Sequence, residues 1–295
     1  MPAQILDGRA LAGELRADLR QRTDVLRDRG CAPRLTVVIV GEDSASVAYV
    51  RSLVNAGAGV GVAVNVDPLP AGADEALLRA RLAALGNDPG VHGVLLQQPL
   101  PVHLAIRRIV DVMPADKDVD GANPVNQGRL AFGSGTAFVP ATPAAVMLLL
   151  ERSPHRMLAG ARACVVGRSN VVGLPVTLLL MAQDATVTST HRLTRNLARH
   201  TREADVLVVA AGVPGLIRGD MVQPGATVID VGTTFVDGRL VGDVVYDEVA
   251  AIAGAITPVP GGVGPVTNIA LMRNVVTAAE RLLPGWGGTA KSHRG

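Results

Sequence analysis

The chain has 295 residues, with 28 Lys and Arg against 26 Asp and Glu, a net charge of +2. This length exceeds what one hydrophobic core usually fills, so we expect two domains, and the balanced charge without a basic cluster excludes nucleic acid as an expected partner. The chain has neither a run of about 18 uncharged apolar residues nor an apolar leader, and its two cysteines are far apart, which together predict a soluble, non-membrane protein of the reducing cytoplasm.

The first half of the chain alternates strand and helix signals. Apolar residues recur at helical spacing over 10–29 and 73–85, and a further helix is expected through Tyr49. Short β-branched runs bounded by Gly or Pro predict strands over 35–41, 62–69 and 91–101. This βαβαβ order is typical of a parallel α/β sheet.

The signals restart near Thr142, which we expect to cap a helix with Pro143 at its first position. Strands are predicted at RACVVG, ATVTST, ADVLVVAAG and ATVIDVG, with a helix from about Val172. The second half therefore predicts another parallel α/β unit. A last helix is expected over 268–283.

The stretch CVVGRSNVVGLP combines a glycine at a strand end, a polar turn, and Gly173 at the opening of a helix. Such a turn presents backbone N–H groups to a phosphate, although a plain strand-to-helix connection has the same outline. An NAD site offers an acid after the next strand, whereas this chain has TSTHR. Arg168 and Arg192 would attract a 2′-phosphate, so the pattern favours NADP.

Two further stretches have the composition of a binding site. TPVPGGVGP, residues 257–265, is rigid at its prolines and accessible at its glycines, which fits a pocket wall or an ordinary turn. In KDVDG, Asp120 could bind an amino-pyrimidine edge, although a solvated acidic turn is the plainer interpretation. Gln97 is expected at the carboxyl end of a strand, where ligand-binding groups collect. No spacing predicts a metal site.

Taken in order, SxxYV, GVLLQQPLP, KDVDG, PATP, GRSNVVGLP, THR, DVG, GDV and TPVPGGVGPVT resemble the methylenetetrahydrofolate dehydrogenase/cyclohydrolase family over nearly the whole chain. The resemblance implies two α/β domains with a cleft between them. Residues 1–141 plus 270–295 would form the folate-binding catalytic domain and 142–269 a Rossmann-like NADP-binding domain. It also implies NADP-dependent oxidation of 5,10-methylenetetrahydrofolate, hydrolysis of the product to 10-formyltetrahydrofolate, and a homodimer.

The same resemblance assigns residues to the two ligands. Tyr49 would stack on the folate ring system, Asp120 would hold the pterin, and Gln97 would serve the hydrolysis. The pocket would be closed by Pro260, Gly261 and Gly262. The NADP site would be lined by Gly167, Arg168, Ser169, Thr190, Arg192, Gly212 and Thr233.

One position departs from the family pattern. The family reads YVxxK, and its catalytic lysine falls on Leu53, while Asn55 occupies the position of a second frequent lysine. Arg51 lies on another part of the helix and keeps its proton at neutral pH. Hydride transfer needs positioning, whereas hydrolysis needs proton transfer, and losing such a group typically costs about 10²–10⁴-fold.

We therefore expect a dehydrogenase with weak or absent cyclohydrolase activity. Two alternatives remain open at this point. One is a fully bifunctional enzyme in which a water or another side chain replaces the lysine. The other is a non-catalytic folate- or NADP-binding paralogue.

Overall fold

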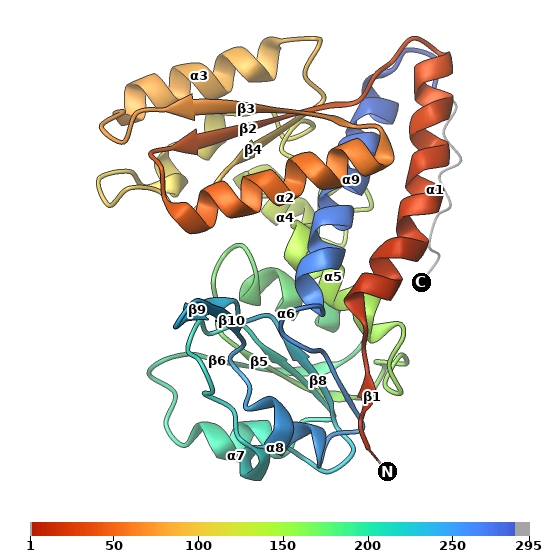
Figure 1. Ribbon diagram of the computed structural model, residues 1–295, viewed down its shortest axis with the longest axis vertical. Helices are drawn as coiled ribbons and strands as arrows, with labels where there is room; N and C mark the ends of the chain where they lie inside the picture. The colour runs from red at the N-terminus through yellow and green to blue at the C-terminus, as the bar shows by residue number, and fades with distance from the viewer. Residues whose placement is uncertain (1, 287–295) are drawn as a thin grey trace. The chain divides into compact units, whose positions relative to one another are not determined.

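A computed structural model describes residues 2–286, and the chain divides into two compact units. Of the described residues, unit 1 contains 2–13 and 140–267, and unit 2 contains 14–139 and 268–286. Figure 1 traces the chain through both units. Residues 287–295, which we expected in the first domain, lie outside the described part of the chain.

Unit 2 is built on a three-stranded parallel sheet of order β3-β2-β4. Its strands are β2 (Arg34–Val40), β3 (Ala63–Leu69) and β4 (Gly93–Leu96). Its helices are α2 (Ser44–Val60), α3 (Glu75–Asn87), η1 (Ile106–Arg108), η2 (Val110–Val112) and α4 (Pro124–Ala131). Two longer helices belong to it in part: α1 (Gly8–Asp28) from residue 14 onward and α9 (Val263–Leu282) from residue 268 onward. Helices α2 and α3 cover opposite faces of the sheet (Figure 1). The βαβαβ order expected for this part is confirmed.

The helices of unit 2 begin and end where the sequence provides the required residues. Asp43 caps α2 by accepting a hydrogen bond from the Ser46 N–H at 2.8 Å, and α2 ends at Gly61, whose φ of 80° suits a residue without a side chain. Asp74 caps α3 in the same way through the Leu77 N–H. These caps set the position at which α2 leaves the carboxyl end of β2.

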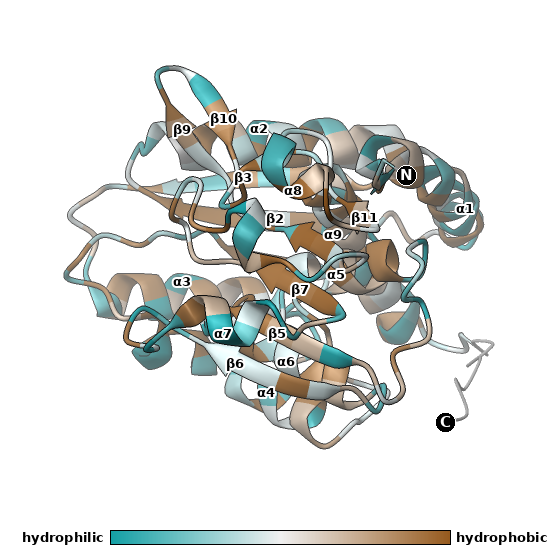
Figure 2. Ribbon diagram, turned by 90° about the horizontal axis from the view of Figure 1, so that it is seen from below, coloured by the Kyte–Doolittle hydropathy of each residue, from teal (hydrophilic) through white to brown (hydrophobic). Residues whose placement is uncertain are grey.

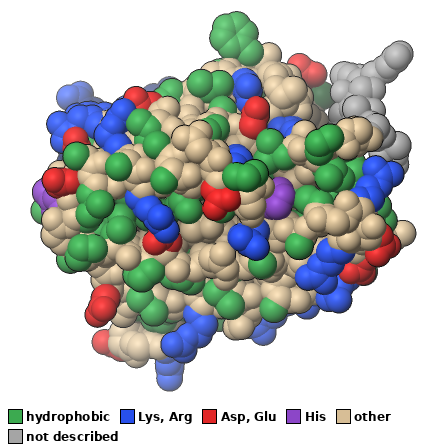
Figure 3. Space-filling view, turned by 90° about the horizontal axis from the view of Figure 1, so that it is seen from above, with side chains coloured by type: hydrophobic (Ala, Val, Ile, Leu, Met, Phe, Trp, Pro, Cys, Tyr) green, Lys and Arg blue, Asp and Glu red, His purple; other side chains and the backbone are tan. Residues whose placement is uncertain are grey.

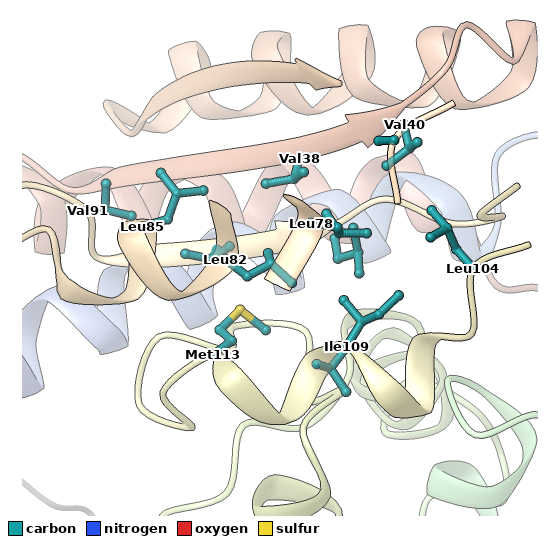
Figure 4. Packing of buried hydrophobic residues seen from close by; sticks show 13 residues of the cluster. Val38, Val40, Leu78, Leu82, Leu85, Val91, Leu104, Ile109 and Met113 are labelled. Carbon is teal, nitrogen blue, oxygen red and sulfur yellow. The ribbon is translucent and has the colours of Figure 1, made fainter. Parts of the chain in front are cut away.

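The core of unit 2 is aliphatic, as the low aromatic content of the chain requires. Leu78, Leu82 and Leu85 lie on one face of α3 and pack on Val38 and Val40 of β2 (Figure 4). The spacing of four and three residues places them on one helical stripe. Leu104, Ile109 and Met113 complete the cluster from the segment after β4.

Unit 1 is built on a six-stranded parallel sheet of order β1-β11-β8-β7-β5-β6. Its strands are β1 (Gln4–Ile5), β5 (Arg162–Val166), β6 (Thr186–Thr190), β7 (Val206–Val209), β8 (Thr227–Asp230) and β11 (Ala255–Ile256). A separate hairpin is formed by β9 (Thr234–Val236) and β10 (Arg239–Val241). The helices of this unit are α5 (Ala141–Leu150), α6 (Gly173–Met181), α7 (Leu197–Thr201), η3 (Gly219–Met221) and α8 (Tyr246–Ala250). Helices α5 and α6 lie on one face and α7 and α8 on the other (Figure 1). The central strand β7 is uniformly hydrophobic (Figure 2), as a strand covered on both faces must be.

Three details differ from the expectations. Residues 2–13 group with unit 1 by their contacts, because β1 pairs in parallel with β11, whereas the folate-binding domain expected from the sequence includes them. Thr142 does not cap α5: the cap residue is Pro140, and Thr142 is already within the helix. Strands β1 and β11 are two residues long each, which is too short for a period of two to be seen in the sequence.

Candidate functional site

The carboxyl edge of the unit 1 sheet carries the dinucleotide-type turn. Gly167 follows β5 with φ of 112°, and a Cβ there would lie 2.1 Å from the Ala210 carbonyl oxygen. Its N–H donates to the Thr190 carbonyl oxygen at 3.0 Å. Only glycine fits this position, because any side chain would collide with the neighbouring loop.

Helix α6 begins directly against this turn. A Cβ on Gly173 would lie 2.0 Å from the Gly167 carbonyl oxygen, and the Ser169 hydroxyl accepts the Val172 N–H at 3.2 Å. The N-terminus of α6 is therefore held at the carboxyl end of β5. A helix N-terminus in this place favours a negatively charged group.

The turn after β5 and the end of β6 contribute cationic rather than acidic side chains. Arg168 and Arg192 are exposed, and neither takes part in the salt bridges found within residues 2–286. Thr190 is buried, and its hydroxyl donates to the Val165 carbonyl oxygen at 3.3 Å, so this hydroxyl is already engaged. The donor set fits a phosphate-bearing dinucleotide.

Loops after β7 and β8 complete this edge. Gly212 has φ of 67°, and Thr233 is exposed in the loop that follows β8. The strand order reverses between β5 and β7, which is the place where open α/β sheets bind ligands. The structure thus brings all the predicted cofactor residues to one edge of the sheet.

The proline- and glycine-rich loop also belongs to unit 1. The Gly262 N–H donates to the Pro258 carbonyl oxygen at 2.8 Å, and the Thr257 hydroxyl accepts the Asp230 N–H at 2.8 Å. A Cβ on Gly8 would lie 1.7 Å from the Gly262 carbonyl oxygen. Pro260, Gly261 and Gly262 are therefore anchored between β8 and the start of α1, in the unit that carries the dinucleotide turn.

Three predicted site residues belong to unit 2: Tyr49 on helix α2, Gln97 after β4, and Asp120 in a turn. Tyr49 is half-buried on α2, and burial together with the charge of Asp120 raises the pKa of its phenol. Gln97 follows β4 and is 8% exposed; its backbone N–H donates to the Val38 carbonyl oxygen. Tyr49 and Asp120 interact electrostatically, so these two predicted residues lie close together.

Leu53 lies one helical turn after Tyr49 and is fully buried, with 0% of its surface exposed. Ser46 lies on the same side of α2, and its buried hydroxyl oxygen has no hydrogen-bond partner. An unsatisfied buried hydroxyl costs free energy unless a ligand or water completes it. The sequence did not single out Ser46, although its spacing of three from Tyr49 in SxxYV places both on one side of a helix.

The charged residues of the KDVDG segment have different surroundings: Lys117 and Asp118 bind backbone groups, and Asp120 is half-exposed. Asp118 is 1% exposed and accepts the N–H groups of Ala122 and Asn123 at 3.0 and 2.8 Å, so it fixes the turn. The Lys117 ammonium donates to the Asp88 carbonyl oxygen at 2.6 Å, near the amino end of β4. Burial lowers its pKa. Asp120 is left as the half-exposed acid of the segment.

Some classes of site find no support within residues 2–286. These residues contain no group of three or more His, Cys, Asp and Glu side chains that could hold a metal ion. None of the helices described is both long and apolar enough to cross a membrane. On the face shown in Figure 3, basic, acidic and apolar side chains are interspersed.

A parallel sheet with a glycine turn at its switch point, in a chain with a second α/β unit, is typical of two-domain proteins that bind a dinucleotide. Comparisons with known proteins specify the family. Residues 6–120 match the model of the tetrahydrofolate dehydrogenase/cyclohydrolase catalytic domain, and 140–283 match its NAD(P)-binding domain. The chain belongs to the tetrahydrofolate dehydrogenase/cyclohydrolase family, so it is an enzyme of folate metabolism with a nicotinamide dinucleotide cofactor.

Individual relatives agree over almost the full length. The bifunctional protein FolD of Polynucleobacter asymbioticus is 47% identical over 95% of this chain and 99% of its own. The crystal structure of the bifunctional FolD enzyme of Campylobacter jejuni superposes with a TM-score of 0.92 at 39% identity, covering 95% and 100% of the two chains. A Trypanosoma brucei FolD, complexed with NADP and inhibitor, gives 0.91 at 38% over 95% and 98%. The predicted family and the two-domain α/β fold are confirmed.

Proposed function

We propose that this protein oxidises 5,10-methylenetetrahydrofolate to 5,10-methenyltetrahydrofolate with NADP, and that its cyclohydrolase activity is weak or absent. The weak cyclohydrolase activity is inferred from Leu53, a fully buried apolar side chain one helical turn after Tyr49. Among residues 2–286 the chain has one lysine, Lys117, and it is bound to Asp88 near the amino end of β4. Gln97 follows the carboxyl end of the same strand.

The folate ring system is proposed to bind at the unit 2 edge. Tyr49 offers an aromatic face, and its raised pKa keeps the phenol neutral at physiological pH. The two oxygens of Asp120 match the ring N–H and amino group of an amino-pyrimidine. The unpartnered Ser46 hydroxyl supplies a further polar contact for a ligand at this edge. Pro260, Gly261 and Gly262 of unit 1 are proposed as further folate contacts, because they match the family pattern.

NADP is proposed to bind at the unit 1 edge, in contact with Gly167, Arg168, Ser169, Thr190, Arg192, Gly212 and Thr233. Thr190 would contribute its backbone, because its hydroxyl is engaged by Val165. Arg168 and Arg192 supply positive charge for a 2′-phosphate, and TSTHR lacks the acid that would repel it. When bound, NADP accepts the hydride. The NADP complex of the Trypanosoma brucei relative supports this choice over NAD.

The two reactions place different demands on the chain. Hydride transfer requires the two ligands to be held in position, which backbone turns, Tyr49 and Asp120 can provide. Hydrolysis requires a proton to be taken from water. Leu53 has no group for this, the Gln97 amide is not a base, and the Tyr49 phenol holds its proton too tightly.

A fully bifunctional enzyme is the second candidate. It is supported by relatives named bifunctional at 47% and 48% identity, and by Tyr49, Gln97 and Asp120, which match the family pattern. In this candidate a bound water, held by Ser46 or Gln97, would take the place of the lysine. A non-catalytic paralogue is less well supported, because the dinucleotide turn keeps its full geometry.

The deciding experiment follows both reactions with the wild-type protein. NADPH formation from methylenetetrahydrofolate should be readily measured, while decay of the methenyl absorbance should stay near the rate in buffer. Rapid methenyl decay would establish the bifunctional candidate. Binding of NADP and folate without NADPH formation would establish the non-catalytic paralogue.

We further propose a homodimer formed through α2 and β3. Strand β3 is one of the two edge strands of the sheet, and a groove of about 380 Å³ beside it is lined by Val47, Val54 and Val66. Glu42 and Arg51 also line it, and opposite charges on one surface suit a twofold contact between two copies. Sedimentation should give a dimer for the wild type and a monomer for Val66→Lys; a dimeric variant would place the interface elsewhere.

The cell compartment is inferred from the cysteines. Cys31 and Cys164 are both buried and free. Free thiols persist in reducing compartments, so we infer the cytoplasm. Finding the protein in an oxidising compartment by cell fractionation would contradict this inference.

A further inference from the structure

Two buried aspartates of unit 1 have no part in the site described so far. Asp230 ends β8 and is 3% exposed, and Asp243 follows β10 and is 0% exposed. Neither takes part in a salt bridge found within residues 2–286. A buried carboxylate without a cationic partner is costly unless hydrogen bonds satisfy it, so the groups that these side chains bind are informative.

Asp230 binds the segment that carries Asp243. One of its carboxylate oxygens accepts the N–H groups of Gly232 at 2.9 Å and Asp243 at 3.0 Å, and the other accepts the Val244 N–H at 3.0 Å. A carboxylate that accepts three backbone N–H groups forms charge-assisted bonds of defined direction. Asp230 therefore fixes the backbone of Asp243 to the end of β8.

Asp243 in turn binds the backbone of the loop after β7. Its Oδ2 accepts the N–H groups of Ala211 at 2.7 Å and Gly212 at 2.8 Å. Its Oδ1 is buried and has no hydrogen-bond partner. One carboxylate oxygen thus holds two consecutive backbone N–H groups of a loop that also contains a proposed NADP contact, Gly212.

The loop lies at the switch point of the sheet. It follows β7, and the dinucleotide turn follows β5, the strand beside it. The Ala210 carbonyl oxygen lies 2.1 Å from the place of a Cβ on Gly167, so loop and turn are in direct contact. A continuous series of contacts therefore runs from Asp230 through Asp243 and the loop to the dinucleotide turn.

The packing around both carboxylates leaves no room for a side chain at Gly232 or Gly242. A Cβ on Gly232 would lie 2.4 Å from Asp243 Oδ1, and a Cβ on Gly242 would lie 1.9 Å from Asp230 Oδ2. The backbone of a glycine therefore packs directly against each carboxyl group. Such close packing holds the carboxylates in one orientation.

We propose that Asp243, held in place by Asp230, is a positioning residue for the cofactor. Its carboxylate fixes the Ala211–Gly212 backbone and, through Ala210, the Gly167 turn, so that NADP meets a preformed edge. This role rests on the proposed NADP site and extends it to a residue that does not itself touch the cofactor. We expect folate binding to change much less than NADP binding, because the side-chain contacts proposed for folate, Tyr49 and Asp120, belong to the other unit.

The test compares Asp243→Ala and Asp243→Asn with a matched control at the opposite edge of the same sheet. Asp205 accepts the Arg162 N–H at 2.8 Å and is hydrogen-bonded by Gln223, so Asp205→Ala also removes a carboxylate that holds backbone. For each protein the NADP dissociation constant is titrated without folate, the KM for each substrate is measured, and the melting temperature is recorded.

Asp243→Ala leaves two loop N–H groups without their acceptor, and we expect NADP binding to weaken about 10–100-fold. Asp243→Asn keeps one acceptor oxygen without the charge, so its NADP affinity should fall between Asp243→Ala and the wild type. The KM for methylenetetrahydrofolate should stay within about twofold in both, since positioning acts on the cofactor side. Asp205→Ala should lower the melting temperature and leave the NADP dissociation constant unchanged.

An NADP affinity for Asp243→Ala within about twofold of the wild type, with a melting temperature lowered as in Asp205→Ala, would overturn the proposal. If Asp243→Ala does not fold, Asp243→Asn decides, and unchanged NADP binding in that variant overturns it too. Failure of the proposed function is distinguishable, because it would appear in the wild type as absent NADP binding or absent NADPH formation.

Discussion

The carboxyl edges of the two sheets are built in different ways. In unit 1 the edge is made of backbone: Gly167 and Gly173 allow turn and helix to touch, and their neighbours cannot tolerate a side chain. In unit 2 the edge is made of single side chains: Tyr49 on helix α2, Gln97 after β4, and Asp120 in a turn. An edge formed by backbone requires glycine at fixed positions, so substituting one of these glycines destroys the binding turn. An edge formed by side chains keeps its shape when one residue is substituted, and only its chemistry changes.

The largest expected effect comes from restoring an amine to the side-chain edge. Leu53→Lys should raise the hydrolysis of methenyltetrahydrofolate by about 10²–10⁴-fold, because a general acid/base group returns beside the substrate. Dehydrogenase activity should remain within about tenfold of the wild type. Decay of the methenyl absorbance and formation of NADPH measure the two effects. Some stability should be lost, since the ammonium replaces a buried leucine.

Leu53→Met is the matched control for this variant. It has nearly the length of lysine without the amine, and volume-conserving swaps of this kind usually cost less than about 1.5 kcal/mol. Hydrolysis should stay at the wild-type level. An equal gain in both variants would show that shape rather than an amine limits the reaction, and our account of position 53 would then be wrong.

The next effect concerns the pH dependence of stability, which we expect to differ between the two edges of the unit 1 sheet. Burial raises the pKa of Asp230 to about 6 at the carboxyl edge, whereas the hydrogen bond from Arg162 lowers that of Asp205 to about 2 at the amino edge. Asp230 therefore contributes stability that is present below about pH 4 and is lost as the pH rises through 6, on the order of 3 kcal/mol in total. Asp205 contributes stability that is present above about pH 4 and is lost as the pH falls toward 2.

Urea unfolding across this range measures both contributions. Between pH 4 and 7 the free energy of unfolding should fall less steeply with rising pH in Asp230→Asn than in the wild type. Below pH 4 it should fall less steeply with decreasing pH in Asp205→Asn. Parallel curves for wild type and Asp230→Asn would mean that Asp230 is ionised at its ordinary pKa in the folded protein.

The smallest effect concerns the exposed arginines of the cofactor edge. Arg192→Ala should weaken NADP binding about 10-fold or somewhat more, through loss of a charge-assisted contact to the 2′-phosphate, and should leave NAD binding within about twofold. Arg199→Ala, an exposed arginine of α7, is the control and should change neither constant. Equal losses for NADP and NAD would show that Arg192 does not read the 2′-phosphate.

Much of the fold could be predicted because its signals are local. The β-branched strands, the caps at Asp43 and Asp74, and the glycine turn after β5 follow from single-residue conformational preferences. The β9–β10 hairpin was missed although its Asp237-Gly238 turn, with φ of 49° and 75°, was visible in the sequence. The pairing of β1 with β11 could not be predicted, since two strands of two residues joined across some 250 positions leave no periodic pattern.

The sequence by itself determined the alternation of strands and helices, the dinucleotide turn, the family motifs and the substitution at Leu53, because each depends on residue type at a fixed spacing. Only the tertiary structure decided that residues 2–13 group with unit 1, that the Thr190 hydroxyl donates to the Val165 carbonyl oxygen, and that Lys117 binds Asp88 near the amino end of β4. It alone also joined Asp230 to Asp243 and to the loop after β7. Contacts between segments distant in sequence depend on how strands are ordered in a sheet, and no local preference encodes that order.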